Sequence, residues 1–112
     1  MEENLRNILE NNAKEYYRNA VQADEKKEYN SAVTLFFKAL VALSDLIIFL
    51  KEKKIPSNHT ERFRILEDKY PEIYQILDKD FSFYQNSYSA KMDKEASNVL
   101  RKDVEKLFKF TG

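Results

Sequence analysis

Residues that break helices or form tight turns are nearly absent from this chain. Among 112 residues there are one glycine and two prolines, namely Gly112, Pro56 and Pro71. A β-sheet protein needs such residues at its many turns, whereas a few long helices need only short connections. The length suits one domain whose core needs no disulfide or metal. We therefore predict a single all-α domain over residues 1–112, an antiparallel bundle of four to five helices.

Apolar side chains recur every three or four residues in five segments, the spacing of one face of a helix. The expected helices cover residues 3–26, 31–53, about 58–69, about 71–90 and 94–109. Side chains that accept a hydrogen bond from the first turn of a helix precede three of these segments. We expect Asn30 or Ser31 to cap the second helix, Ser57 or Asn58 the third, and Asp93 the last.

The segment 31–53 is the most apolar part of the chain. Its apolar stripe consists of Ala32, Val33, Phe36, Phe37, Leu40, Leu43, Ile47 and Leu50. Further apolar residues widen the stripe until little polar surface remains, and a helix of this kind has to be covered nearly all round. Since a chain of this size offers few neighbouring helices, we expect a second copy of the protein to cover part of it. The candidate dimer interface consists of Leu35, Val41, Ile48 and Phe49.

The same segment is not expected to cross a membrane. Its most apolar part, residues 35–50, is shorter than a bilayer-spanning helix and is interrupted by Lys38, Ser44 and Asp45. The first four residues are polar and acidic, unlike a targeting signal. We therefore expect a soluble, cytoplasmic protein without a membrane partner.

Charge and residue types argue against several kinds of site. The chain has 19 Lys and Arg and 19 Asp and Glu, so no net charge attracts nucleic acid or an anionic membrane. It has no cysteine and one histidine, so a zinc site would lack its usual ligands. A glycine-rich phosphate loop cannot form with one terminal glycine. We therefore expect neither a metal nor a cofactor.

A local basic patch is the strongest candidate for a binding site. It consists of Lys51, Lys53, Lys54, His59, Arg62 and Arg64. If the second and third helices form a hairpin, these side chains gather at one end of the bundle, where they would bind the phosphates of RNA or of a nucleotide. The alternative is a solvated helix end whose positive charges complement the helix dipole.

Two further features have both a functional and a structural interpretation. The aromatic run 81–88 can stack on unpaired bases, but aromatic residues at helical spacing are more often part of a core. Asp45 stands inside the apolar segment. A polar network with a tyrosine hydroxyl or with an arginine of a neighbouring helix is favoured there over a catalytic acid.

The chain also resembles a known family of helical proteins. The run 29–43, which reads YNSAVTLFFKALVAL, is similar to the helical hairpin of HEPN domains. Residues 56–59, which read PSNH, are similar to the histidine-containing helix start that follows it, and residues 81–88 correspond loosely to the family's functional segment. The resemblance implies a compact, dimeric bundle that cleaves RNA as a toxin or serves as the partner of a nucleotidyltransferase.

The nuclease signature of the family is missing. That signature is an arginine followed shortly by a histidine, whereas here no arginine lies between Arg64 and Arg101, and the single histidine, His59, precedes this interval. The resemblance therefore implies a non-catalytic homodimer that acts as an interaction or accessory module, with contact to nucleic acid or nucleotide through the basic patch.

Two alternatives from other classes stay open. One is an RNase or nucleotide-processing enzyme that uses His59 with Arg62 or Arg64 as base and phosphate ligand. The other is a purely protein-binding adaptor built on a tetratricopeptide-like hairpin, although nothing at the repeat period follows it. The residues that match part of such a repeat are Ala20, Ala32, Phe36 and Ala39.

Overall fold

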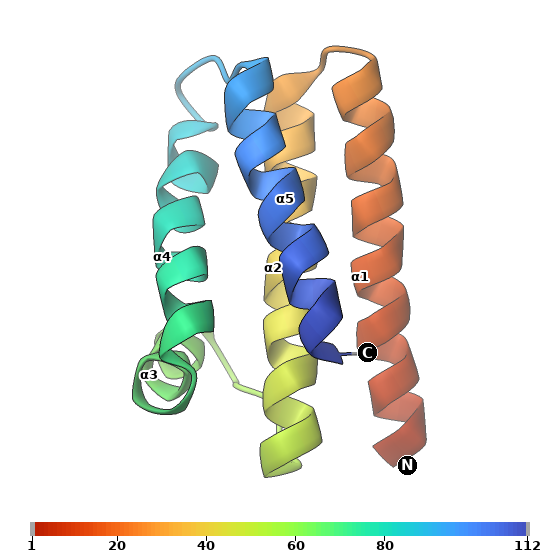
Figure 1. Ribbon diagram of the computed structural model, residues 1–112, viewed down its shortest axis with the longest axis vertical. Coiled ribbons are helices and arrows are strands. Elements are labelled where there is room, and N and C mark those ends of the chain that lie inside the picture. The colour runs from red at the N-terminus through yellow and green to blue at the C-terminus, as the bar shows by residue number, and fades with distance from the viewer. Residues whose placement is uncertain (1, 112) are drawn as a thin grey trace.

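The computed structural model describes residues 2–111 and contains, over this range, five helices and no strand (Figure 1). The helices are α1 (Glu2–Glu25), α2 (Tyr29–Glu52), α3 (His59–Lys69), α4 (Pro71–Asn86) and α5 (Lys94–Thr111). The helices α1, α2, α4 and α5 alternate in direction along the long axis, while α3 lies across one end of the bundle (Figure 1). The prediction of an all-α antiparallel bundle is confirmed.

The apolar helix α2 is the centre of the bundle. It packs against α1, α5 and α4, and 14 of its 24 residues are buried. Most of α2 is therefore covered by the same chain, so its apolar pattern does not require a second copy. Ile48 and Phe49 are 0 % and 5 % exposed, which removes them from the candidate dimer interface. Leu35 and Val41 are half-buried and keep some accessible surface.

By length and composition, the whole of α2 is long and apolar enough to cross a membrane, although its part 35–50 is too short for this. In its most apolar window of 18 residues, however, 72 % of the residues are buried against the rest of the bundle. The core helix of a soluble bundle meets the same criteria, so this property alone assigns no membrane role.

The predicted caps are confirmed for two helices. The Oδ1 of Asn58 accepts a hydrogen bond from the backbone N–H of Glu61 at 2.9 Å, at the start of α3. The Oδ1 of Asp93 accepts one from the backbone N–H of Ala96 at 2.8 Å, at the start of α5. These bonds satisfy donors that the first turn of a helix leaves unpaired.

The start of α2 differs from the prediction, because Asn30 has another role. The helix begins at Tyr29 without a side-chain cap, so neither Asn30 nor Ser31 caps it. The Nδ2 of Asn30 donates to the carbonyl oxygens of Ser87 and Ala90 at 2.9 and 2.8 Å, and its Oδ1 accepts from the N–H of Met92 at 2.8 Å. These bonds hold the α4–α5 loop against α2, and α4 ends at Asn86 rather than near residue 90.

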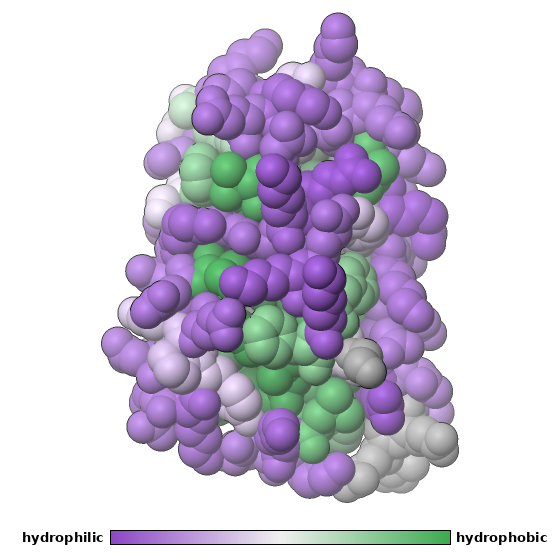
Figure 2. All heavy atoms as spheres, viewed as in Figure 1, coloured by the Kyte–Doolittle hydropathy of each residue, from purple (hydrophilic) through white to green (hydrophobic). Residues whose placement is uncertain are grey.

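The face that carries α5 is mostly hydrophilic (Figure 2). Apolar surface is visible in the lower half of that view, toward the C-terminal end of α5 (Figure 2). Phe110 is 46 % exposed and borders a hollow of about 440 Å³ that Ile47, Tyr70 and Ile73 also line.

Candidate functional site

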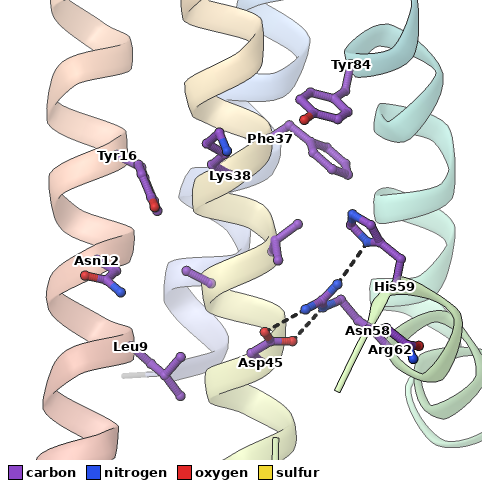
Figure 3. A pocket seen from close by; sticks show the side chains of 12 residues that line it. Leu9, Asn12, Tyr16, Phe37, Lys38, Asp45, Asn58, His59, Arg62 and Tyr84 are labelled. Atoms are coloured by element: carbon purple, nitrogen blue, oxygen red, sulfur yellow. Dashed lines mark hydrogen bonds and ion pairs between the residues drawn. The ribbon is translucent and has the colours of Figure 1, made fainter. Parts of the chain in front are cut away.

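A groove of about 530 Å³ runs along the side of α2 that faces away from α5 (Figure 3). Its floor is formed by α2, one wall by α1, and the other wall by the start of α3 and by α4. The lining residues are Leu9, Asn12, Tyr16, Phe37, Lys38, Val41, Ala42, Asp45, Asn58, His59, Arg62 and Tyr84. A concave site of this size that mixes apolar and polar side chains is typical of ligand-binding sites.

A buried ion pair joins two sides of the groove. Arg62 donates from Nε to Oδ1 of Asp45 at 2.7 Å and from Nη2 to Oδ2 at 2.9 Å. Both side chains are about nine-tenths buried, with 10 % and 11 % of their surface exposed. The predicted polar network of Asp45 with an arginine of a neighbouring helix is therefore present. A charge-assisted bidentate pair of this kind fixes the position of α3 against α2.

The single histidine extends this pair. The Nη1 of Arg62 lies 2.9 Å from Nδ1 of His59. Because a guanidinium can only donate, Nδ1 is an acceptor and the proton of the neutral ring is on Nε2. His59 is exposed overall, but partial desolvation of its ring lowers its pKa below the ordinary value of 6.5, and the positive charge of Arg62 lowers it further against the opposing charge of Asp45. The ring also packs against Phe63 and Phe81, with centroid distances of 6.1 and 5.7 Å.

The residues of the predicted basic patch lie in different environments in the structure. Arg62 points into the core and is occupied by Asp45, so it is not available to bind phosphate. Arg64 is 73 % exposed and lies 3.8 Å from Glu61, outside the lining of the groove. The three lysines of the patch are exposed at the C-terminal end of α2. They are Lys51, Lys53 and Lys54.

The aromatic run on α4 is partly core and partly surface. The rings of Phe37 and Tyr84 stack with centroids 4.7 Å apart and an interplanar angle of 18°. Phe81 packs beside them, as expected for a core position. The hydroxyl of Tyr84 lies 2.9 Å from that of Tyr88, whose side chain is 76 % exposed. The run therefore forms one wall of the groove and ends at an exposed tyrosine.

A pair of carboxyl groups lies apart from the groove, on α4 and α5. Asp80 is fully buried and lies near Asp103 and Lys79, whose Nζ is 3.7 Å from Oδ1 of Asp80 and 3.1 Å from Oδ2 of Asp103. Burial and, to a smaller extent, the neighbouring carboxyl of Asp103 raise the pKa of Asp80 to about 9 against the opposing charge of Lys79. With this pKa, Asp80 is protonated at neutral pH and can donate a hydrogen bond to Asp103.

No group of three or more His, Cys, Asp or Glu side chains with the arrangement of a metal site occurs in the described part of the chain. Comparison with protein-family models, curated proteins and solved structures found no match. Fold and site together define a helical-bundle protein with a groove in which Asp45, Arg62 and His59 are bonded to one another.

Lys38, Asn12 and Tyr16 are among the groove residues that were not predicted to belong to a site. Lys38 had one available signal, because it is a lone cation within an apolar helix. Nothing comparable marked Asn12 and Tyr16, which lie on the amphipathic helix α1 among many polar residues. Their place in the groove depends on how α1 is rotated against α2, which a single-helix pattern does not specify.

Proposed function

We propose that the protein is a non-catalytic accessory module that pairs with a second copy of itself, as the resemblance to HEPN domains implies. The pairing face is the one that carries the groove. The observation that supports this face is the presence of exposed apolar side chains at both rims of the groove.

The rims of the groove are apolar and accessible. Ile8 is 55 % exposed and lies one turn before Asn12, on the same face of α1 as the groove wall. Tyr88 is 76 % exposed on the opposite rim, next to Tyr84. Val41 is half-buried on the floor between them. Exposed apolar residues grouped on one face indicate a protein–protein interface.

The chemistry of the groove does not favour catalysis. A general base needs a free lone pair, but Nδ1 of His59 accepts from Arg62 and Nε2 carries the proton. The carboxylate of Asp45 is held by Arg62 through both of its oxygens. The enzyme alternative needs His59 as base and Arg62 as phosphate ligand. These two side chains are hydrogen-bonded to each other, and Arg62 is also bound to Asp45.

Light scattering on the purified protein over a range of concentrations tests the proposal. We expect twice the mass of one chain for the wild type, and the mass of a single chain for Ile8→Glu and Tyr88→Glu. Phe110→Glu alters the apolar surface beside α5 and serves as the matched control, which should remain a dimer. A wild-type monomer at every concentration contradicts the pairing, and a monomer from Phe110→Glu alone contradicts the choice of face.

A second candidate function is RNA contact through the lysines at the end of α2. The observation in its favour is that Lys51, Lys53 and Lys54 are all exposed at this end. Binding through phosphates weakens as salt is raised, because counterions are released. A titration of labelled single-stranded RNA at two salt concentrations, followed by a denaturing gel, tests for salt-sensitive binding without cleavage. Lys54→Glu should weaken such binding. Binding that changes neither with salt nor with this substitution argues against RNA contact through these lysines.

A further inference from the structure

We propose that the groove is a binding site for a small organic anion with a flat apolar body, and that Lys38 holds the anionic group. The site goes beyond the proposed self-association, because every residue that builds it belongs to one chain.

Lys38 provides an uncompensated positive charge on the floor of the groove. Between Ser31 and Leu50, only Lys38 and Asp45 are charged. Asp45 is neutralised by Arg62, whereas Lys38 is exposed and has no hydrogen bond or ion pair to another residue in the described range 2–111. The groove lining therefore carries one net positive charge, from two cations and one carboxylate.

The other polar groups nearby offer donors rather than acceptors. Because Nδ1 of His59 is bonded to Arg62, Nε2 carries the proton, and this N–H has no hydrogen-bond acceptor among residues 2–111. Nε2 is directed along the groove toward Phe37 (Figure 3). Asn58 uses Oδ1 as the cap of α3, which leaves its amide N–H groups available. These donors line the same groove as the ammonium group of Lys38, and donors together with a cation are complementary to an anion.

The apolar part of the groove is suited to a flat body. The stacked rings of Phe37 and Tyr84 stand on one wall, and Tyr16 stands on the other (Figure 3). Val41 and Ala42 form the floor between Lys38 and Asp45. Aromatic walls and an aliphatic floor favour a ring system, and the volume of about 530 Å³ accommodates one with its anionic substituent.

A pair of fluorescent probes separates charge from apolar contact. The probe 1-anilinonaphthalene-8-sulfonate carries one anionic group, while N-phenyl-1-naphthylamine has the same rings without it. We expect the wild type to bind the sulfonate, and Lys38→Met to weaken this binding about tenfold or more, because it removes one charge-assisted bond. Binding of the uncharged probe should not change in Lys38→Met, which keeps the length and apolar character of the side chain.

Lys102→Met is the matched control, since Lys102 is an exposed lysine of α5 outside the groove lining. It should leave the binding of both probes unchanged. Circular dichroism checks that each variant keeps its helices. Absence of sulfonate binding by the wild type, equal binding by Lys38→Met, or an equal loss in Lys102→Met would each overturn the inference.

Two natural sources share this ligand chemistry, an aromatic carboxylate and a nucleoside monophosphate. Displacement of the bound sulfonate by indole-3-acetate or by adenosine 5′-monophosphate distinguishes them, and displacement by neither overturns the inference. The titration is repeated with Ile8→Glu, which alters the rim but not the lining. A wild type that is monomeric yet binds through Lys38 contradicts the proposed pairing alone, whereas a dimer without sulfonate binding contradicts the anion site alone.

Discussion

Arg62 on α3 and Asp45 on α2 face each other in a bidentate ion pair, with N–O distances of 2.7 and 2.9 Å. The two residues are 17 positions apart and lie on opposite sides of the loop that contains Pro56. The pair is the most buried polar link between α3 and α2 among the described residues. It fixes the wall of the groove that carries His59.

Removal of one partner of this ion pair should destabilise the folded protein. We expect Arg62→Met to lower the free energy of unfolding by about 3–5 kcal/mol, because the charge of Asp45 is then buried without a partner. Urea denaturation monitored by circular dichroism measures the change. Arg64→Met, at an exposed position of the same helix, should stay within about 0.5 kcal/mol of the wild type. A similar effect of the two variants would contradict this role of the pair.

The titration of His59 reports directly on the groove, because the chain has one histidine. Partial desolvation of the ring and the charge of Arg62 hold the pKa of His59 below 6.5 in the folded protein. The unfolded chain therefore binds a proton first as the pH falls, so the associated stability is present above pH 6.5 and is lost below it. The imidazole resonances in proton NMR measure the pKa of the folded protein and of the urea-unfolded chain. An equal or higher value in the folded protein would contradict the geometry.

Asp80 should make the protein more stable at acidic than at alkaline pH. Its pKa is about 9 in the folded protein and 3.8 ordinarily, so the folded state keeps a proton in this interval that the unfolded chain has released. The free energy of unfolding therefore falls as the pH rises through this window. We expect Asp80→Asn to raise the free energy of unfolding by at least about 1 kcal/mol at pH 8. The reason is that an amide can donate to Asp103 at any pH, whereas the carboxyl group of Asp80 has to stay protonated to do so.

Urea denaturation at pH 5, 7 and 9 checks this expectation, and the variant should show a flatter dependence on pH than the wild type. Asp78→Asn, at an exposed position of α4, is the control and should keep the wild-type dependence. A destabilised Asp80→Asn at pH 8 would show that the buried carboxyl is not protonated there.

The side chain of Asn30 should determine the order of the α4–α5 loop. Asn30→Ala leaves two carbonyls and one N–H of the loop without their partner, at a cost of about 2 kcal/mol in the free energy of unfolding. Hydrogen exchange measures the local effect, and the amide of Met92 should exchange faster in the variant. Asn19→Ala removes an exposed asparagine on α1 and should leave that amide unchanged. Equal exchange rates at Met92 in all three proteins would contradict the role of Asn30.

Local patterns were sufficient for much of the secondary structure. The spacing of apolar residues located five helices to within a few residues, and Asn58 and Asp93 were recognised as caps from their chemistry alone. Asn30 was misread as a cap because its partners, the loop residues Ser87 to Met92, lie more than 50 positions away. In the sequence, an asparagine that caps its own helix cannot be distinguished from one that bonds to a distant loop.

By itself, the sequence determined that this chain forms a helical bundle with α2 at its centre, because helix propensity and apolar periodicity are local properties. Tertiary structure decided which charges are free. Six basic-patch residues looked equivalent along the chain, yet packing of α3 against α2 turned Arg62 toward Asp45. Lys38, which lies outside that patch, is on the groove floor without a hydrogen-bond or ion-pair partner among residues 2–111. The rotation and crossing of helices depend on the sum of many weak contacts between distant segments, and no single segment contains that information.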